Sequence, residues 1–569
     1  MYDVVIIGGG PAGSSCGSLL KKYDPNLRVA IFERETFPRD HIGESLLPAV
    51  CQVLKEMDAW DKVERADFPI KIGATYRWGA TKELWDFEFL PGRDFKDDPR
   101  PGKFAGQRAM TAFQVDRSIY DELLLDHAAE MGCEVREETK VVEINKTGDH
   151  IDSVKLGTGE VIEAKYFIDA SGVSGIIRRA MDVGVDYPTT LRNIAIWDYY
   201  QNADWAVNIG VGGTRITVMS LGYGWIWFIP IGPTRTSIGL VIPLEYYKQS
   251  GKRPEELFLQ GLADEPLISQ LIKNGTRENR LTTTNDWSYI ADRLCGDNWF
   301  LIGDTCGFAD PILSAGMTLA MMGARQVAYS ILAMERKEHE KQWLMDFYNE
   351  SHRKRIRQHV LFADFWYTSN GQFTDLIDYT KEIAETSGLN LTPDEAFRWL
   401  GTGGFAHEDP AAAMVGGFPV QAVQAVNQKF SQQSVTWQVA ENNVFKLNLE
   451  GAVEDTMPIF FEGKIWPKTC YRREGKILPK YGVFDIAVKL LEKEQYAVPA
   501  VDRLRAFFQR TPLYSSPDVG IQMTLSTMEA MIADGWIVAS VDPTQPFFPF
   551  SIDEESEAIH KNFDFAVTV

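Results

Sequence analysis

Apolar positions at the start of the chain follow the periods of a strand, a helix and a second strand. Residues 2–7 (YDVVII) and 28–33 (RVAIFE) are short β-branched runs, and 14–23 (SSCGSLLKKY) has the spacing of an amphipathic helix. A strand that is apolar at almost every position is typical of a parallel sheet covered on both faces. The pattern predicts a strand–helix–strand unit that opens an α/β domain.

The turn between the first strand and the helix reads GGGPAG at residues 8–13, a G-x-G-x-x-G sequence. Gly8 permits a tight turn, Gly10 lets the backbone approach a pyrophosphate, and Gly13 lets the helix pack against the strand. Glu33 ends the second strand 20 residues beyond Gly13, where an acceptor for a ribose hydroxyl belongs. This context predicts a dinucleotide site, whereas the glycines alone are also compatible with a plain βα turn. The predicted contacts in this segment are Gly8, Gly10, Ala12, Gly13, Glu33 and Arg34.

β-Branched and aromatic residues dominate three runs between about residues 190 and 280: NIAIWDYY, TRITVMSLGYGWIWFIPI and TSIGLVIPL. Their composition predicts a mixed β-sheet inserted into the nucleotide-binding unit. Within GWIWFIPI, Trp225 and Trp227 stand at alternate positions, so both indoles should lie on one face of a strand. On period alone, such a pair is best interpreted as core packing.

After about residue 365 the pattern becomes helical, in segments such as AVQAVNQKF and VFDIAVKLLEKE. We therefore predict an α/β fold in two domains. Residues 1–365 form a Rossmann-like core with the inserted sheet at about 190–280, and residues 366–569 form a mainly helical domain with a winged-helix-like end at 497–538.

Composition limits the partners and the compartment. The chain has 569 residues, 45% of them hydrophobic, and a net charge of −21, which repels nucleic acid and anionic lipid. The six cysteines form no CxxC pair and show no zinc spacing, so we expect reduced thiols and no metal site. No segment has the length of a membrane span or the features of a signal peptide, so we expect a cytoplasmic enzyme.

Two further segments specify the nucleotide. Residues 165–172 (KYFIDASG) and 299–316 (WFLIGDTCGFADPILSAG) each end a strand in an acidic turn, and the second leads into a helix. This layout resembles the para-hydroxybenzoate-hydroxylase-like flavoproteins over about the first 350 residues. The resemblance implies FAD, with Asp304 at its ribityl or pyrophosphate region and Ser45, Arg117 and Gly316 among its contacts. Taken alone, Asp304 reads as a turn or cap aspartate.

The run WIWFIP matches the W-x-W-x-I-P motif of flavin-dependent halogenases, which the chain also resembles at FPRDHIGESLLP (37–48). The resemblance is closest to the branch of the chloramphenicol-biosynthesis halogenase. It implies that Trp225 and Trp227 separate the organic substrate from the flavin, and that Lys71 is the catalytic lysine. The predicted halide contacts are the backbone donors of Ser314, Ala315 and Gly316.

Two acidic residues, Glu44 and Asp286, each allow two interpretations. Glu44, in the GES sequence, is either a proton partner near the halide or the lysine, or a support for the flavin loop. Asp286, in NDWSY, matches an aspartate that can carry a covalent bond to the flavin's 8α-methyl group, or it caps a short loop.

The resemblance also implies a reaction. Reduced flavin and oxygen give a C4a-hydroperoxide, chloride attacks its distal oxygen, and hypochlorous acid then travels through a tunnel to an electron-rich, phenolic or other aromatic ring. It implies FADH2 from a separate flavin reductase, and a substrate that is free or held on an acyl or peptidyl carrier protein. The alternatives are a flavin-dependent hydroxylase, a geranylgeranyl-reductase-like enzyme, and a flavin-bound scaffold protein.

Overall fold

The computed structural model describes residues 1–90, 92–285, 288–376, 438–511, 513 and 516–548, and the backbone of residues 559–561. The chain forms two compact units. The first comprises Met1–Gly388, Glu462–Lys464 and Lys561–Val569, and the second comprises Leu389–Phe461 and Ile465–His560.

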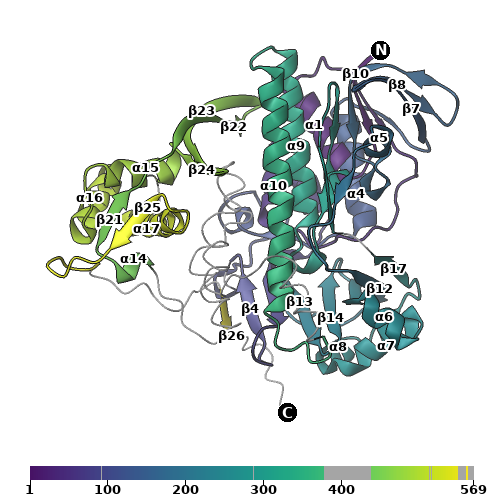
Figure 1. Cartoon of the computed structure of the whole chain (residues 1–569). Helices are drawn as coiled ribbons and strands as arrows, with labels where there is room; N and C mark the ends of the chain where they lie inside the picture. The colour runs from purple at the N-terminus through teal and green to yellow at the C-terminus, as the bar shows by residue number, and fades with distance from the viewer. Residues whose placement is uncertain are drawn as a thin grey trace. The chain divides into compact units, whose positions relative to one another are not determined.

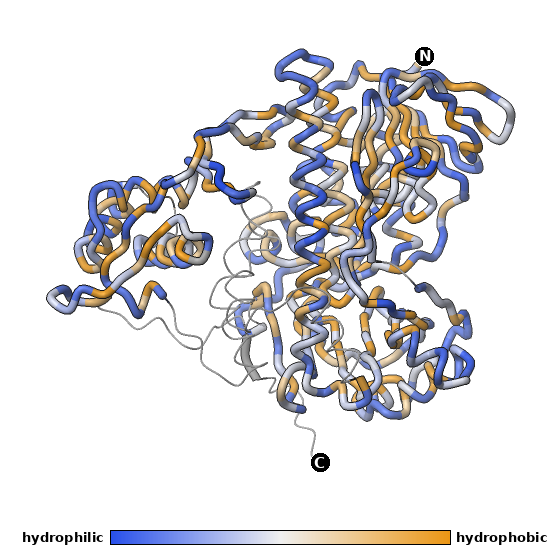
Figure 2. Tube along the Cα trace, viewed as in Figure 1, coloured by the Kyte–Doolittle hydropathy of each residue, from blue (hydrophilic) through white to orange (hydrophobic). Residues whose placement is uncertain are grey.

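A parallel sheet forms the centre of the nucleotide-binding part of the first unit (Figure 1). Its order is β19–β10–β1–β2–β6, and every neighbouring pair is parallel. The strands are β1 (Tyr2–Ile7), β2 (Val29–Phe32), β6 (Glu134–Arg136), β10 (Ala164–Asp169) and β19 (Trp299–Leu301). Strands β1, β2 and β19 are mainly apolar and buried, as strands covered on both faces should be, and orange predominates in this region of Figure 2. The predicted Rossmann-type α/β fold is confirmed.

Helices cover this sheet and connect its strands. Helix α1 (Pro11–Tyr23) follows the glycine turn and packs against α9 (Gly316–Glu335). Helix α10 (Lys341–Thr368) follows α9, and the two run side by side in Figure 1. The other helices before the inserted sheet are α2 (Pro48–Glu56), α3 (Trp60–Arg65), α4 (Arg117–Glu130) and α5 (Ile176–Ala180).

The inserted sheet is present and is larger than predicted. Its order is β16–β12–β15–β14–β13–β3–β4–β26, with β17 paired to β12 and β5 paired to β3. The strands inside the predicted insertion, or just after it, are β12 (Asn193–Gln201), β13 (Gly213–Leu221), β14 (Gly224–Pro230), β15 (Arg235–Pro243), β16 (Thr276–Arg277) and β17 (Thr282–Asn285). The strands from outside it are β3 (Ile70–Arg77), β4 (Trp85–Glu88), β5 (Ala112–Phe113) and β26 (Ile559–Lys561). The segment that carries Lys71 is therefore part of this sheet.

The two faces of the inserted sheet have different neighbours. On one face, Ile226, Phe228 and Leu240 pack with Leu257 and Phe258 of α7 (Pro254–Asp264). Helices α6 (Leu244–Ser250) and α8 (Pro266–Leu271) lie nearby in sequence, and α8 contributes to the same cluster. On the other face, Trp225 of β14 meets the last turn of α10 through a hydrogen bond to Tyr367.

Small sheets complete the first unit. They are β7 (Val141–Thr147), β8 (His150–Leu156) and β9 (Val161–Ile162), and β11 (Val185–Asp186), β18 (Tyr289–Ala291) and β20 (Gly307–Phe308). Short 3-10 turns occur at Gly92–Asp94, Gly106–Ala109, Gly172–Ser174, Gly303–Thr305 and Pro311–Leu313.

The second unit contains both helices and strands in its described part. Its helices are α14 (Gln438–Glu441), α15 (Gly482–Leu491), α16 (Ala497–Arg510) and α17 (Pro517–Ala533). Strands β21 (Val444–Leu447) and β25 (Ile537–Ser540) pair with each other, and β22 (Val453–Phe461), β23 (Lys464–Arg473) and β24 (Lys476–Pro479) form a second sheet. Side chains such as Phe445, Leu504 and Met528 form a core of its own. The sequence analysis missed these strands.

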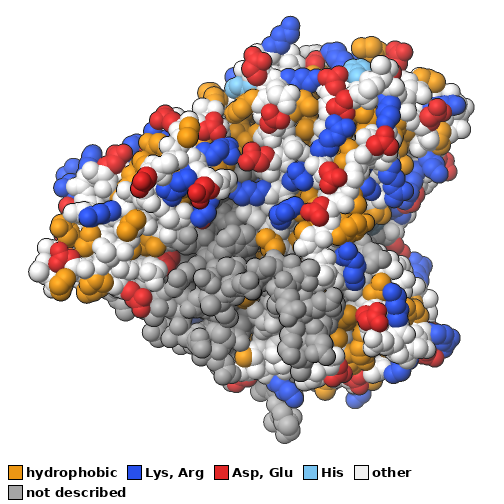
Figure 3. All heavy atoms as spheres, viewed as in Figure 1, with side chains coloured by type: hydrophobic (Ala, Val, Ile, Leu, Met, Phe, Trp, Pro, Cys, Tyr) orange, Lys and Arg blue, Asp and Glu red, His pale blue; other side chains and the backbone are white. Residues whose placement is uncertain are grey.

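Charge and thiols follow the composition. On the face shown in Figure 3, acidic and basic side chains of the described residues are interspersed and do not gather by sign. All six cysteines are buried and free. Among the described helices, none combines the length and the apolarity that a membrane crossing requires.

Candidate active site

The glycine turn between β1 and α1 gives a ligand close access to the backbone. Gly8 has a φ of +112°, and a Cβ at this position would lie 2.3 Å from the carbonyl oxygen of Ala170. A Cβ at Gly13 would lie 2.0 Å from the carbonyl oxygen of Gly8, so the helix packs directly on the turn. At Gly10 the nearest atom to such a Cβ is 3.7 Å away, which leaves the N-terminus of α1 open to a phosphate.

Glu33 and Arg34 have different environments. The buried Glu33 carboxylate accepts hydrogen bonds from the backbone N–H groups of Gly9, at 2.7 Å, and Glu35, at 3.0 Å. It therefore fixes the conformation of the glycine turn. Arg34 is exposed, and its guanidinium donates to the hydroxyl of Ser174 at 3.2 Å.

Asp304 lies close to the start of α1. A Cβ on the preceding residue, Gly303, would lie 3.1 Å from the Cβ of Ala12, so the two predicted cofactor segments meet here. Among the described residues, no side chain donates a hydrogen bond to the Asp304 carboxylate. Burial raises the pKa of Asp304 to about 6, and the positive charge of Arg117 opposes this rise.

Arg117 and Ser45 lie on either side of the loop at residues 42–44. Arg117 makes a two-pronged ion pair with Asp121, at 2.6 and 2.8 Å, and donates to the carbonyl oxygen of Ile42 at 2.6 Å. The buried Ser45 hydroxyl has no hydrogen-bond partner among the residues that the structure describes. The open helix end, this hydroxyl and the Asp304 carboxylate match the phosphates and ribityl hydroxyls of FAD, so the residues present fit the cofactor. Asp286, the predicted covalent attachment point, lies outside the described residues.

The predicted halide turn leads into α9. Ser314 has a φ of +58°, and Gly316 is the first residue of the helix, so the first backbone N–H groups of α9 have no partner within the helix. Asp310 accepts a hydrogen bond from the backbone N–H of Ile312 at 3.0 Å and so stabilises the preceding 3-10 turn. The arrangement offers backbone donors and the positive end of a helix dipole to an anion.

Trp225 and Trp227 lie side by side on β14, as their alternation predicts. Both are buried, and their ring centroids are 5.9 Å apart with an interplanar angle of 54°. The Trp225 indole N–H donates to the hydroxyl of Tyr367 at 2.6 Å, and the Trp227 indole N–H donates to the hydroxyl of Ser237 at 3.1 Å. A Cβ at Gly239 of β15 would lie 2.1 Å from the Trp227 ring, so this indole lies flat on the neighbouring strand.

Aromatic rings extend this face beyond Trp225. The Trp78 ring lies 6.4 Å from that of Trp225 and 6.2 Å from that of Trp366, and its indole N–H donates to the carbonyl oxygen of Trp366 at 2.8 Å. The Tyr367 ring is 5.9 Å from that of Trp78. The last turn of α10 therefore contributes to the aromatic layer around the tryptophan pair.

Lys71 is buried near an aromatic ring and has no acidic partner. Its side chain is 2% exposed, and its ammonium lies 5.4 Å from the centre of the Phe89 ring. No hydrogen bond or ion pair joins it to another described residue. Burial lowers the pKa of Lys71 to about 7, so charged and neutral forms coexist near neutral pH.

A β-bulge decides where Lys71 points. Lys71 pairs with Thr214 and Gly73 with Arg215, so Ile72 is an extra residue in the ladder. Without it, Lys71 would share a face with Gly73. Ile72 instead packs with Leu90, whereas Lys71 contacts Phe89, which is on the opposite face of the neighbouring chain.

The bulge thereby brings Lys71 to the same face as the tryptophans. Beyond it, Ala74 and Tyr76 continue the Lys71 face. Tyr76 pairs with Val218, which in turn pairs with Trp227, so all three lie on one face of the sheet. Lys71, Trp225 and Trp227, predicted from separate motifs, are therefore found on the same side of one sheet.

Glu44 is buried next to Ser237, whose hydroxyl accepts the hydrogen bond from Trp227. It is 2% exposed, and within the described part of the chain no donor meets either carboxylate oxygen in hydrogen-bond geometry. Burial raises the pKa of Glu44 to about 7, and the adjacent hydroxyls of Ser237 and Tyr199 lower it. Because an indole N–H can only donate, the Ser237 oxygen accepts from Trp227 and its hydrogen remains available to Glu44.

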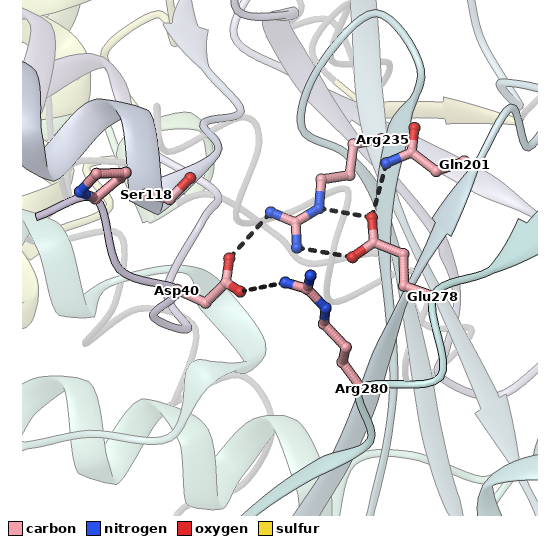
Figure 4. A pocket seen from close by; sticks show the side chains of 7 residues that line it. Asp40, Ser118, Gln201, Arg235, Glu278 and Arg280 are labelled. Carbon is pink, nitrogen blue, oxygen red and sulfur yellow. Dashed lines mark hydrogen bonds and ion pairs between the residues drawn. The ribbon is translucent and has the colours of Figure 1, made fainter.

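A polar cavity of about 530 Å³ lies between the loop after β2 and the inserted sheet (Figure 4). Arg235 is at its centre, with ion pairs to Asp40 at 3.1 Å and to Glu278 at 3.0 Å. The Arg235 guanidinium also lies 3.9 Å from the centre of the Tyr199 ring. This ion cluster joins the loop after β2 to the inserted sheet, and the four predicted catalytic side chains are not part of the cavity wall.

Several residues of the site were not predicted from sequence. They are Tyr199, Ser237, Asn193, Asp310 and Tyr367. Each lies on a different segment from the motif it contacts, and none has a sequence pattern that sets it apart from a core residue. Asp310 lies in the stretch DPILSAG, and Asn193, Tyr199 and Ser237 lie in runs that were predicted only as strands of the inserted sheet.

Sequence comparison identifies the family. The FAD binding domain family matches residues 1–363. The 1H-pyrrole-2-carbonyl-[peptidyl-carrier protein] chlorinase of Pseudomonas fluorescens is 32% identical over 388 residues, which are 66% of this chain and 86% of that protein. The tryptophan 2-halogenase of Chondromyces crocatus is 32% identical over 377 residues, 65% of this chain and 68% of that protein.

Solved structures agree with this assignment. The myxobacterial chondrochloren halogenase CndH is 28% identical and has a TM-score of 0.58, covering 68% of this chain and 91% of its own. The flavin-dependent halogenase CmlS is 24% identical and has a TM-score of 0.71, covering 96% of this chain and 97% of its own, so the likeness in fold includes the C-terminal unit. On this evidence the chain belongs to the flavin-dependent halogenases, enzymes built on the FAD binding domain.

Proposed function

We propose that the protein chlorinates an electron-rich, phenolic or other aromatic ring with hypochlorous acid that forms on the flavin side of Trp225 and Trp227. The observation that carries the proposal is a buried amine, that of Lys71, on the same face of the sheet as the two indoles. An enzyme that placed its substrate directly on the flavin would need neither the barrier nor a buried amine beyond it.

When FAD is bound, its reduced form supplies with oxygen the two-electron oxidation that converts chloride into hypochlorous acid. The chain's own groups do the rest. The backbone N–H groups of Ala315 and Gly316 hold the halide at the start of α9, whereas that of Ser314, the third predicted contact, donates to the carbonyl oxygen of Pro311 at 2.9 Å. The tryptophans exclude the ring from the flavin while a small neutral oxidant passes, which makes them a steric barrier.

Lys71 orients the oxidant on the substrate side. Its ammonium donates a hydrogen bond to hypochlorous acid and makes the chlorine more electrophilic, and its neutral amine can instead form a chloramine. The pKa of about 7 makes both forms available. In either case chlorine replaces a ring hydrogen, the hydrogen leaves as a proton, and the oxygen leaves as water.

Glu44 is proposed as the acid–base group on the flavin side. The hydroxyls of Ser237 and Tyr199 face it, and its pKa of about 7 lets it exchange a proton at neutral pH. The neighbouring loop is held by Arg117, so Glu44 is placed by backbone that also contacts the cofactor site.

Partners and cofactor attachment are part of the proposal. FADH2 comes from a separate reductase, since the sequence has no second glycine fingerprint that would bind a nicotinamide dinucleotide. A carrier-tethered substrate is supported by the similarity to a pyrrolyl carrier-protein chlorinase. The six reduced thiols suit the cytoplasm.

Asp286 is the proposed covalent link to the flavin, and acid precipitation tests it. Flavin that stays with the pellet supports the link, and flavin released to the supernatant refutes it.

Product mass tests the function. The protein is supplied with FADH2, oxygen and chloride, and with a series of phenols and pyrroles, free and on a carrier protein. We expect a chloride-dependent increase in product mass. The Trp225→Ala/Trp227→Ala variant should bind FAD but release peroxide or hydroxylate the substrate, and Trp466→Ala, an exposed tryptophan of β23, serves as control. Normal chlorination by the double variant would refute the barrier.

A further inference from the structure

The hydroxyl of Tyr367 is the centre of a buried hydrogen-bond network that joins the tryptophan pair to the halide turn. It accepts from the Trp225 indole N–H at 2.6 Å and from the side-chain amide of Asn193 at 3.2 Å. It also lies 3.2 and 3.3 Å from the two carboxylate oxygens of Asp310. All four side chains are at most 3% exposed, so water does not substitute for these contacts.

The direction of each hydrogen bond follows from the chemistry of the groups. An indole N–H and an amide NH2 can only donate, so they occupy both lone pairs of the Tyr367 oxygen. Its single hydrogen is then directed to Asp310. The Asn193 amide also donates to Asp310, at 3.2 Å, which makes this carboxylate the acceptor in which the network ends.

Asp310 transmits the network to the halide turn. The same carboxylate accepts the backbone N–H of Ile312 at 3.0 Å and so fixes the 3-10 turn Pro311–Leu313. That turn ends at Ser314, whose φ of +58° reverses the chain into Gly316 and the first N–H groups of α9. A shift of Asp310 would therefore change the direction in which these donors point.

A second buried acid, Asp364, lies near Asp310. Asp364, one turn before Tyr367 on α10, is buried and accepts from the Thr189 hydroxyl at 2.5 Å. Burial raises the pKa of Asp364 to about 8, and the negative charge of Asp310 adds to the rise. The Asp364 carboxyl therefore holds its proton to a higher pH than a free aspartic acid does.

We propose that Tyr367 is a positioning residue that fixes the orientation of the Trp225 indole and, through Asp310, the backbone donors of the halide turn. The barrier and the halide site are thereby held by one hydroxyl group. The proposal rests on the proposed function in one respect, that the turn at 314–316 holds the halide. No sequence motif contains Tyr367, and neither comparison assigns it a role.

The test is the Tyr367→Phe variant, which removes the hydroxyl and keeps the ring. Halide binding is measured on FAD-loaded protein without turnover, from the change in flavin absorbance on titration with chloride and bromide. We expect the halide dissociation constant to rise about tenfold, because a buried bond to a charged acceptor is lost. In cofactor-free protein, the near-ultraviolet circular dichroism of the tryptophans should change, and FAD affinity should stay within about twofold of that of the wild type.

Tyr223→Phe is the matched control. Tyr223 is also buried and donates to a carboxylate, that of Asp264, at 2.7 Å, but it lies on the helix-covered face of the same sheet. It should leave halide binding unchanged. Trp225→Phe is the second variant: Tyr367 can still donate to Asp310, so the halide dissociation constant should rise less than in Tyr367→Phe.

The outcomes separate the proposals. Halide affinity equal to wild type in Tyr367→Phe overturns the positioning role, and so does an equal loss in Tyr223→Phe. If Tyr367→Phe does not fold, a loss of halide affinity in Trp225→Phe as large as about tenfold overturns it. If halide binds to the wild type and depends on Tyr367 but no substrate is halogenated, the proposed function fails and the positioning role stands.

Discussion

At the scale of single residues, Lys71 is the unusual group of the molecule. Lysine is rarely buried without an acidic partner, because the ammonium loses its hydration. Lys71 is 2% exposed, and the described residues offer its ammonium the face of Phe89 but no ion pair. Burying Lys71 lowers the free energy of unfolding, whereas a hydrophobic residue at this position would not. A buried charge that destabilises the fold is typical of a functional residue.

Lys71→Met should abolish halogenation, because methionine fills the volume but has no N–H group for the oxidant. FAD binding should be unchanged, since no predicted cofactor contact involves Lys71. The measurements are product mass and flavin titration, with Lys155→Met, a half-buried lysine of the β7–β8 sheet, as control. Chlorination at the wild-type rate would remove Lys71 from the mechanism.

The same substitution should raise stability in a pH-dependent way. The native pKa of Lys71 is about 7, against 10.5 for a free lysine, so the cost of burial is complete below pH 7 and declines as the pH rises toward 10.5. Lys71→Met should therefore stabilise the cofactor-free protein more at pH 6 than at pH 9, by about 2–3 kcal/mol. Melting temperatures of both proteins at the two pH values measure this; an equal gain at both would show that Lys71 titrates normally.

At the scale of elements, the bulge in β3 decides which face receives Lys71. Deleting Ile72 should restore a regular ladder with β13 and turn Lys71 to the opposite face, where the charges of Arg215 and Glu88 lie. We expect loss of halogenation with FAD binding retained. Val142 is the extra residue of a similar irregularity in β7 and is exposed, so its deletion is the matched control. Activity of the Ile72 deletion comparable to that of the control would mean that Lys71 reaches the site by another route.

This element also shows where prediction from sequence stops. The glycine turn, the strand–helix–strand unit around it and the shared face of Trp225 and Trp227 follow from short-range periods, and the structure confirms them. The face of Lys71 does not, because the bulge depends on a pairing with Thr214, more than a hundred residues away. Tyr367 and Ser237 escape for the same reason: their contacts are fixed only by tertiary packing.

At the scale of the whole molecule, every thiol is shielded. The six cysteines are free and buried, and burial raises the pKa of Cys51 and Cys133 to about 12. The native protein should react slowly with a thiol reagent at pH 8. After denaturation, six thiols per chain should react with the reagent. Reducing agents should not change its melting temperature. Fewer than six equivalents after denaturation would indicate a disulfide.

The two units differ in how far sequence could describe them. In the first unit, apolar runs predict the strands and glycine spacing predicts the turn. In the second, β22 and β23 carry Pro458 and Pro467 and several charged residues, which are typical of loops or edge strands, so their β-structure was missed. The helices α16 and α17, in contrast, coincide with the predicted helical part of residues 497–538.

Gly239 has a consequence for the design of this site. The Trp227 ring packs directly on the backbone of Gly239. Its distance from the adjacent strand therefore depends on Gly239 having no Cβ. A single carbon at this position would act as a spacer and lift the ring away from the sheet. In the proposed barrier, the position of Trp227 is thus adjustable from a residue on the neighbouring strand that has no proposed part in the chemistry.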